Sequence, residues 1–594
     1  MSPGDASVNG ENFWSVTVRS RLSALTGDPS LQTSDVATDL RNLLLKERSD
    51  FLQELHTING HINALSRTSR LPAELLAYVF SFCAADSKAW REMNAGIGWV
   101  VVTHVCRRWR HIALSHPRLW RYLDFPLSLS WAQEMISRSK AIPCIVSWIS
   151  GYPRTGRPPS VLGDGFNELA LSQLHGIEQL RLDGFDGTTQ SLEAVLALPA
   201  PDLTTVDIKC KGLFLPPNIF DGIAPRLRNV SVVGCLTFPW TSPILQNVVN
   251  LKVEGEHLSF ILSTRTELLS ALQAMRALEK LALVSCLPDS PTLAHTTSHV
   301  IAPPNLQYLE LCGDLFPCAD ILRHVRIPHT GIKLRLQCET SGTANDFEVL
   351  FPFIVAAGGT PPKPFACIEV ETQSRTCFVL DGERSPVNDI ESWERGPNGP
   401  NLQLFLDWSV EMGWTAVDLL QAACKAVSVD HLQYLTVDIE EFSERWNMPP
   451  QKFDLPVWLD TFGRAKELHF VKTWGHAGHS LCEALSQASH DGGHWQSTLR
   501  TPLGPLFMPA LKTLRLYMVR FSHLFVGGQL KLRKFLPLVL QARNLAGAPR
   551  LDLEMSTCSQ KMEDELKELV DSFDLLQEPE SDWDNSGSDE ESQL

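Results

Sequence analysis

The sequence predicts a mixed α/β protein in which a small helical bundle is followed by a long, irregular array of strand–turn–helix repeats. Three observations carry this prediction: an apolar stripe with helical spacing near the start, a dense run of large apolar residues over 71–120, and an apolar motif at positions k, k+3 and k+5 that recurs from about residue 160. With 594 residues, 44% of them hydrophobic, the chain can bury a sizeable core.

The acidic balance of the chain lies mainly at its C-terminal end. Residues 563–594 contain thirteen carboxylates and one lysine, which is −12 of the formal net charge of −16. The rest of the chain is therefore nearly neutral, and it offers no basic excess of the kind that binds nucleic acid. Residues 577–594 contain no basic residue and hardly any apolar one, so they are predicted to be an acidic disordered tail.

The remaining composition favours a soluble intracellular protein, cytoplasmic or nuclear. No apolar run approaches the roughly 18 residues that a membrane helix needs, and the first residues lack a basic segment followed by an apolar one. The 14 cysteines are scattered singly without a CxxC pair, as expected of reduced thiols, and they indicate neither a disulfide framework nor a zinc ribbon. We expect no cofactor and no metal.

A polar leader over 1–33, predicted to be disordered, precedes an amphipathic helix over 34–66. The apolar residues of this helix recur at steps of three, four or seven and form one stripe: Leu40, Leu44, Phe51, Leu55, Ile58, Ile62 and Leu65. The stripe must pack against something. It suits packing on the protein itself, and homodimerisation through a coiled coil stays open, although Gly60 interrupts the run.

The densest local signal lies in residues 67–125. Pro72 and Glu74 suit a first helical turn, and Leu75, Leu76, Val79 and Phe80 give that helix an apolar face. After a polar connection, residues 99–115 are expected to form a second helix, which His116-Pro117 ends before Trp120. A bundle of this size cannot hide all of its apolar surface, so a partner is expected.

These residues, in this order and spacing, resemble an F-box in the form common in mushroom-type fungi. The similar motifs are Leu71-Pro72-x-Glu74-Leu75-Leu76-x-x-Val79-Phe80, then residues 105–113, then Pro117-x-Leu119-Trp120. The resemblance implies docking to the Skp adaptor of SCF-type cullin-RING ubiquitin ligases. The implied adaptor-binding residues are Leu71, Pro72, Leu75, Leu76, Val79, Phe80, Val105, Cys106, Trp109, Ile112 and Trp120.

The charge of residues 67–124 agrees with an acidic partner, because nine Lys or Arg stand against four Asp or Glu. The alternative is a small self-contained helical bundle. Residues 126–165, rich in proline and glycine at 151–165, are expected to be a linker.

From 166 to 576 the recurring motif predicts repeats that each contain one strand. It is found at Ile177/Leu180/Leu182, Leu203/Val206/Ile208, Leu227/Val230/Val232, Val248/Leu251/Val253, Leu278/Leu281/Leu283, Leu306/Leu309/Leu311, Phe365/Ile368/Val370, Leu432/Leu435/Val437 and Leu511/Leu514/Leu516. The pattern resembles a leucine-rich-repeat solenoid with stretched later units. An ordinary α/β domain with parallel strands is the alternative. Leu566, Leu569, Val570, Phe573 and Leu576 predict a helix that caps the array.

In such a solenoid, strand residues between and after the two apolar positions face solvent on the concave side. These candidates for target binding are Arg181, Asp183, Asp207, Lys209, Lys252, Glu254, Glu310, Glu369, Glu371, Asp438 and Arg515. Their mixed charge suits a polar protein surface, while a merely solvated strand face is the competing interpretation.

Sequence motifs for catalysis are lacking. There is no GxGxxG, GxxxxGK[ST], GxSxG or HExxH. His469, His476, His479, Cys482, His490 and His494 form a local enrichment with spacings that could bind zinc, but their glycine-rich surroundings are more typical of an exposed loop.

The sequence therefore favours a non-catalytic substrate receptor of a ubiquitin ligase, which joins the Skp adaptor and an unknown target protein. The first alternative is a repeat scaffold that binds proteins without a ubiquitin role. The second is a metal-dependent α/β enzyme that uses the histidine cluster.

Overall fold

The computed structural model divides into two compact units, which are treated separately below. Unit 1 comprises residues 1–123 and 133–142, and unit 2 comprises residues 124–132 and 143–594. The structure describes residues 10–26, 34–85, 98–125, 129–149, 174–186, 190–255, 264–288, 300–326, 331–342, 344–357, 363–374, 377–384, 400–408, 415–439, 453–486, 506–519, 521, 531–556 and 558–576. The acidic segment 577–594 lies outside the described residues.

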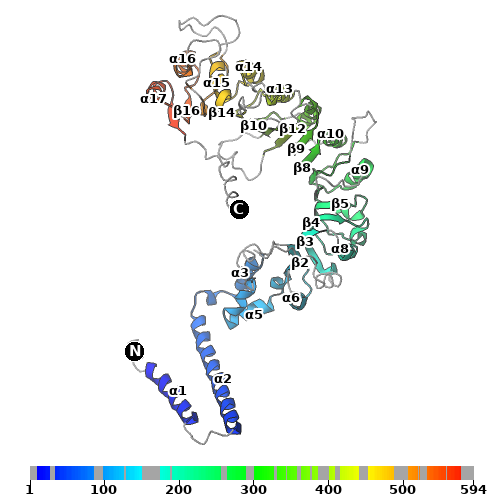
Figure 1. Ribbon diagram of the computed structural model, residues 1–594, viewed down its shortest axis with the longest axis vertical. Helices are drawn as coiled ribbons and strands as arrows, with labels where there is room; N and C mark the ends of the chain where they lie inside the picture. Colours follow the sequence, from blue (N-terminus) through cyan, green and yellow to red (C-terminus); the bar gives the residue numbers. More distant parts are fainter. Residues whose placement is uncertain are drawn as a thin grey trace, which may run out of the picture. The chain divides into compact units, whose positions relative to one another are not determined.

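Unit 1 is helical. Its elements are α1 (Gly10–Thr26), α2 (Ser34–Ala64), η1 (Thr68–Arg70), α3 (Ala73–Ala85), η2 (Gly98–His104), α5 (Arg107–Ser115) and η3 (Pro117–Arg121). Figure 1 shows α1 beside the longer α2, with α3 and α5 following. β1 (Tyr122–Phe125) and α6 (Leu129–Ser139) contain the boundary residues between the units.

Two expectations for unit 1 need correction. The leader 1–33 contains a helix, α1, which an ion pair from Arg21 to Glu47 joins to α2 at 2.7 Å. Residues 99–115 do not form one helix, because the 3₁₀ segment η2 ends at His104 and α5 begins at Arg107. The break lies at Cys106, whose extended backbone lets its sulfur accept the amide of Trp109 as a helix N-cap.

Large side chains fill the core of the helical segment 68–121. Phe80 packs against Trp109 and Trp99 against Trp120, each with 5.0 Å between ring centroids. Trp120 is buried and its Nε1–H donates to the carbonyl of Ala113 at 2.8 Å, so the polar end of the indole is satisfied.

Unit 2 is built on the sheet. The described residues contain one sheet of 17 strands, whose members in this unit are β2 (Cys144–Ile149), β3 (Ile177–Asp186), β4 (Thr205–Phe214), β5 (Asn229–Thr237), β6 (Asn250–Glu254), β7 (Lys280–Val284), β8 (Tyr308–Asp314), β9 (Lys333–Thr340), β10 (Cys367–Ser374), β11 (Cys377–Glu383), β12 (Leu402–Trp408), β13 (Tyr434–Asp438), β14 (Phe470–Trp474), β15 (Thr513–Tyr517), β16 (Asp552–Met555) and β17 (Ser572–Leu575). The segment 126–165, expected to be a linker, thus contains β2 and the whole of α6.

Neighbouring strands from β2 to β9 pair in parallel and in sequence order, and so do β13 to β17. Between these runs the order is inverted. β9 pairs with β12, β12 with β11, β11 with β10 and β10 with β13, and the two β11 pairings are antiparallel.

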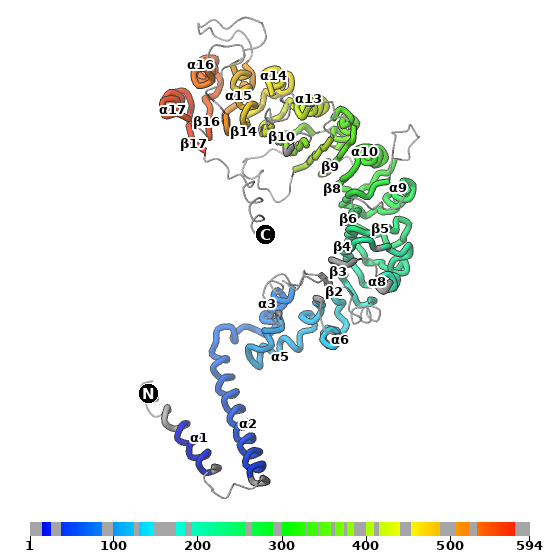
Figure 2. The backbone as a smooth tube through the Cα atoms, in the orientation of Figure 1, coloured from blue at the N-terminus to red at the C-terminus, as the bar shows by residue number. Residues whose placement is uncertain are grey.

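Helices cover one face of this sheet, as Figures 1 and 2 show for α9, α10, α13 and α14. The helical elements of unit 2 after α6 are η4 (Leu174–Gly176), α8 (Gln190–Leu196), η5 (Ile219–Gly222), η6 (Pro243–Asn247), α9 (Arg265–Ala274), α10 (Leu315–His324), η7 (Ala344–Leu350), α11 (Phe351–Ala356), α13 (Ala416–Ala426), α14 (Leu455–Phe462), α15 (Gly475–Ala484), α16 (Leu532–Leu545) and α17 (Gln560–Lys567).

Alternation along each strand separates a buried face from a more exposed one. Leu251, Leu281 and Leu309 are register partners on β6, β7 and β8, and all three are buried. The residue one position later on these strands points to the other side of the sheet. We call that side, which the helices do not cover, the open face.

The predicted capping helix also needs correction. The helix of this region, α17, ends at Lys567, and residues 572–575 form the last strand, β17. Met562 and Leu566 are the buried residues of α17, while β17 pairs in parallel with β16. The apolar spacing over 566–576 therefore joins the end of a helix to a short strand.

Candidate functional site

The entry to α3 is fixed by contacts from another helix. Pro72 lies just before α3, where a residue needs no backbone N–H for the helix, and its carbonyl accepts the amide of Leu76 at 3.1 Å. The guanidinium of Arg108, on α5, donates to the carbonyl oxygens of Ser69 and Leu71. The Leu71-Pro72 segment is therefore held in place by α5 as well as by its own turn.

α3 has two apolar faces. Leu76, Ala77, Phe80 and Ala84 are buried in the helical core. The opposite side carries a second set of apolar side chains, all at least 36% exposed: Leu71, Leu75, Tyr78, Val79 and Phe82. We call these five residues the α3 face.

The α3 face is continuous along the helix. Its members recur at steps of three or four residues, which places them on one side of a helix. The rings of Tyr78 and Phe82 pack edge to face with centroids 4.8 Å apart. Five large apolar side chains in water are costly, so this face is suited to a protein partner.

The structure sorts the eleven residues that the sequence proposes for adaptor binding. Leu71, Pro72, Leu75, Val79 and Val105 are exposed; Cys106 and Trp109 are half-buried; and Leu76, Phe80, Ile112 and Trp120 are buried. The buried four build the core that supports the α3 face.

Tyr78, Phe82 and Val101 are exposed apolar residues that the sequence interpretation did not select. The steps from Leu71 to Leu75, and on to Tyr78 and Phe82, follow helical spacing and could have identified the first two. Val101 lies in η2, which is a 3₁₀ segment, so the α-helical spacing assumed for these residues assigned its side chain to the wrong face.

The described charges near α3 are mostly basic. Arg67, Arg70, Arg107, Arg110 and Arg118 are exposed, and Glu74 is the exposed acidic side chain among residues 67–85 and 98–121. This surface is complementary to an acidic partner.

On the sheet, the eleven residues proposed for target binding lie at open-face positions, exposed or half-buried. Register places them in two rows. Arg181, Asp207, Lys252, Glu310, Glu369 and Arg515 belong to the first row, and Asp183, Lys209, Glu254, Glu371 and Asp438 to the second. Residues far apart in sequence therefore share a surface.

Ion pairs link neighbouring positions of these rows. Lys209 lies 3.9 Å from Asp183, and Lys252 lies 2.8 Å from Glu254. The sequence interpretation missed two members of the first row that pair with predicted residues: Arg335 lies 3.4 Å from Glu310, and Glu554 lies 2.6 Å from Arg515.

Aromatic rings join this surface near β14 and β15. Trp474 and Tyr517 stack with centroids 4.9 Å apart, and the ammonium of Lys472 lies 5.1 Å from the Trp474 ring centroid. The sequence interpretation missed all three, because it selected only charged residues that lie between or just after the two apolar positions of the recurring motif, and β14 does not carry the full motif.

The described part of the histidine segment is not an exposed loop but a helix. His476, His479 and Cys482 lie on α15, and His479 and Cys482 are buried. His476 Nε2 lies 3.1 Å from Asp454 Oδ1, and His479 Nδ1 lies 3.6 Å from Glu483. Gly478 lets α15 approach the sheet, because a Cβ there would lie 2.6 Å from Cγ2 of Val519.

A metal site is not assembled within the part of the chain that the structure describes, where no group of three potential ligands is found. His469 is half-buried at the start of β14, and His490 and His494 lie outside the described residues. Among the described helices, none is long and apolar enough to cross a bilayer.

Comparison with known proteins identifies one part of the chain. Residues 68–126 match the family model described as F-box-like. No curated protein matches the sequence. The chain thus contains an F-box-like domain, at the position of the α3 face, and this domain indicates an adaptor role in a ubiquitin ligase.

Proposed function

We propose that this protein is a substrate receptor of an SCF-type cullin-RING ubiquitin ligase. In this proposal the F-box-like domain binds a Skp-type adaptor, and unit 2 binds a target protein. The protein contributes proximity between target and ubiquitin-loaded enzyme, which raises their effective concentration, and no bond chemistry of its own.

The observation that carries the proposal is the α3 face on the F-box-like domain. It consists of five exposed apolar side chains, and a buried core of large side chains holds it rigid. Preorganised apolar side chains lose little entropy on binding, so they can anchor a partner. The exposed arginines nearby would add attraction to an acidic adaptor.

We further propose that unit 2 is a leucine-rich-repeat-like solenoid. Parallel pairing in sequence order, with a buried apolar pair on each strand except β14, where Thr473 takes the second position, supports this architecture for β3–β9 and β13–β16. The antiparallel β11 departs from a regular repeat and would be an insertion within it. In such a solenoid the open face offers a row of mostly polar side chains, interrupted by Ala282 on β7, for recognition of a protein surface.

Adaptor binding is tested by co-expression of the full chain with a Skp-type adaptor. We expect Leu75→Asp and Val79→Asp, at side chains 50% and 49% exposed, to reduce co-purification at least about tenfold while leaving the fold intact. Leu76 is unsuitable for this test because it is only 2% exposed, so a charge there would unfold the domain.

The matched control is Leu545→Asp, which places the same charge at a leucine 65% exposed on α16. It should leave adaptor binding unchanged. Wild-type protein that recovers no adaptor, or α3-face variants that bind as well as wild type, would contradict the proposal.

Target binding is tested separately on the open face. We expect Arg335→Glu combined with Lys472→Glu to remove proteins that co-purify with the wild type, while adaptor binding is retained. Lys534→Glu, at an exposed lysine of α16, is the control. An unchanged set of co-purified proteins would exclude these open-face residues from target binding.

A further inference from the structure

A second apolar surface lies on α2, outside the F-box-like domain. Six large side chains follow one another along its C-terminal half and the next turn, and each is 40–77% exposed: Phe51, Leu52, Leu55, Ile58, Ile62 and Leu65. We call this set the α2 stripe. The stripe is too long and too regular to be scattered surface leucines.

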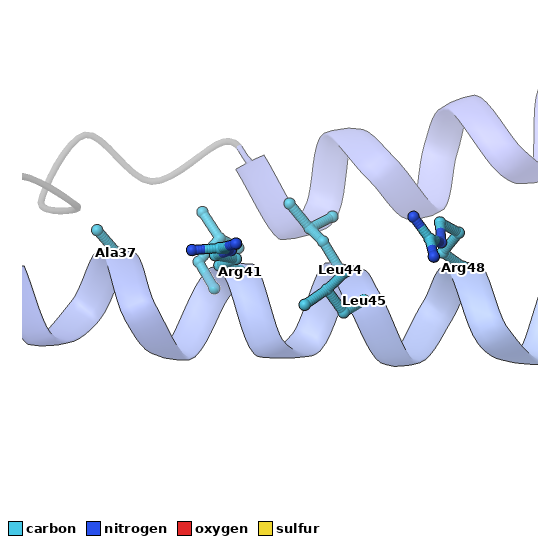
Figure 3. Close-up of a pocket in the computed structure, with 6 residues that line it drawn as sticks. Ala37, Arg41, Leu44, Leu45 and Arg48 are labelled. Carbon is cyan, nitrogen blue, oxygen red and sulfur yellow. The ribbon is translucent and has the colours of Figure 1, made fainter. Parts of the chain in front are cut away.

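The earlier part of α2 has a neighbour within the chain. Figure 3 shows Leu44 and Arg48 pointing toward α1, in a groove lined by Ala37, Leu40, Arg41, Leu44, Leu45 and Arg48. Leu40, Leu44 and Glu47 are correspondingly half-buried, and Arg21 of α1 holds Glu47 at 2.7 Å. Beyond Arg48, each residue of the α2 stripe still exposes at least 40% of its surface.

The spacing of the stripe is that of a coiled-coil seam. With Leu55 and Ile62 at position a, Phe51, Ile58 and Leu65 fall at position d, and Leu52 widens the seam at position e. A helix with such a seam buries it against a second helix of the same pattern. A second copy of this chain carries that pattern.

We propose that two copies of the protein pair through their α2 stripes in antiparallel orientation. Antiparallel packing places position a of one helix against position d of the other. Phe51 then lies opposite the partner subunit's Ile62, and Leu55 lies opposite the partner subunit's Ile58.

Charge decides between antiparallel and parallel pairing. With the positions given above, Glu54 and His61 both fall at position g of the heptad. Antiparallel pairing sets position g against position g, which brings Glu54 beside the partner subunit's His61 and favours attraction when the imidazole is protonated. Parallel pairing would set position g against position e, where Glu54 would meet the uncharged Asn59.

The area suffices for a specific interface. Two stripes of six large, roughly half-exposed side chains bury on the order of 1,000 Å² together, which is the lower bound for a biological contact. An interface of this area predicts a dimer with a dissociation constant in the micromolar range, which single substitutions in the seam should weaken.

Light scattering with size-exclusion chromatography of the full chain, at about 1–50 µM, measures the association. At the highest protein concentration we expect the mass of two chains. Leu55→Lys and Ile62→Lys should each weaken dimerisation at least about tenfold. Leu43→Lys is the matched control, because Leu43 is 42% exposed against 46% for Leu55 but lies off the seam.

A charge exchange tests the orientation. Glu54→Lys should weaken the dimer, and the addition of His61→Glu to the same chain should restore it. Circular dichroism and adaptor binding should be unchanged in all variants, which separates loss of pairing from loss of fold. The proposal would be overturned by a wild-type protein that has the mass of one chain at every concentration, or by seam variants that stay dimeric. It would also be overturned if His61→Glu did not restore the dimer of the Glu54→Lys variant.

Discussion

Arg108 donates to the carbonyl oxygen of Leu71, a residue 37 positions earlier in the chain. The same guanidinium also donates to the carbonyl of Ser69. One side chain of α5 therefore fixes the turn that starts α3, and this turn sets the direction in which the side chains of the α3 face point. The planar fork of arginine suits this task, because it reaches two acceptors at once.

The first prediction follows from this contact. Replacement of Arg108 by methionine removes two charge-assisted hydrogen bonds and should lower the free energy of unfolding of the domain by about 1–2 kcal/mol. The misplaced Leu71 should weaken adaptor binding about tenfold in calorimetric titration. Arg108→Lys keeps the charge but cannot hold both carbonyls, so it should recover only part of the affinity; binding at the wild-type level in both variants would show that the contact is dispensable.

The F-box-like domain was predictable from its motif, but the division of its residues between core and surface was not. Leu75 and Leu76 are adjacent and chemically identical, yet one is half-exposed and the other buried. A helix turns by about 100° per residue, so an uncertainty of one residue in its orientation exchanges the two faces. The break at Cys106 had the same effect on residues 99–105, whose burial follows a 3₁₀ segment.

The strands of unit 2 that carry the recurring apolar motif were predictable because that motif is local in sequence, whereas β2 and β17 lie in segments that were expected to be a linker and a helix. Leu180 and Leu182 lie on β3 and Leu514 and Leu516 on β15, with their side chains buried as expected. The order of the strands between β9 and β13 was not predictable. It depends on the pairing of Leu334 with Leu402, residues distant in sequence whose local patterns resemble those of the other repeats.

The second prediction concerns a polar cluster between α9 and α10. Arg265 lies 3.2 Å from Oδ2 of Asp320 and 2.8 Å from Nε2 of His324, and both of these partners are buried. Because an arginine only donates, Nε2 of His324 is the acceptor and the ring proton lies on Nδ1, where the carbonyl of Asp320 accepts it at 2.7 Å. The cluster thus ties the two helices together.

Loss of Asp320 should leave Arg265 without this carboxylate and open the helix pair. We expect Asp320→Ala to reduce hydrogen-exchange protection of α9 and α10 by about 2 kcal/mol, while distant α16 keeps its protection. In Arg265→Ala/Asp320→Ala the loss should be smaller than the sum of the single losses, because the two residues act as a pair. Strict additivity would contradict the coupling.

The third prediction concerns pH. Burial raises the pKa of the Asp381 carboxyl on β11, against the lowering effects of its 3.4 Å hydrogen bond from Gln403 and of the charge on Arg335. A raised pKa in the folded state means that ionisation of this group opposes folding above that pKa. This destabilisation of the folded state decreases as the pH falls from the folded-state pKa toward the ordinary aspartate value.

Replacement of Asp381 by asparagine removes the buried charge and should stabilise unit 2 at neutral pH, by about 1 kcal/mol. The advantage should shrink as the pH falls through the folded-state pKa toward the ordinary aspartate value of about 4. Denaturant unfolding of the wild type and of Asp381→Asn, between neutral pH and about pH 4, measures the difference in their free energies of unfolding. A variant less stable than wild type at neutral pH would contradict this assignment.

The fourth prediction orders the reactivity of the cysteines. The cysteines differ in exposure: nine are buried, and five are partly exposed, namely Cys83, Cys106, Cys312, Cys377 and Cys558. Burial raises the pKa of Cys424 and of Cys482 to about 12. At pH 8 their thiolate fraction is then about one in ten thousand, and the thiolate is the form that reacts with alkylating agents.

Brief treatment of the native protein with iodoacetamide at about pH 8, followed by peptide mass spectrometry, should therefore label Cys83 and Cys106 first and leave Cys424 and Cys482 unmodified. Denaturant removes both burial and the pKa shift, so all four should then react at similar rates, which serves as the control. Adaptor bound to the α3 face should slow the labelling of Cys83, one residue after Phe82, without changing that of Cys558 on the other unit. Early labelling of Cys482 in the native protein would show that α15 opens from the sheet, contrary to the buried packing around Gly478.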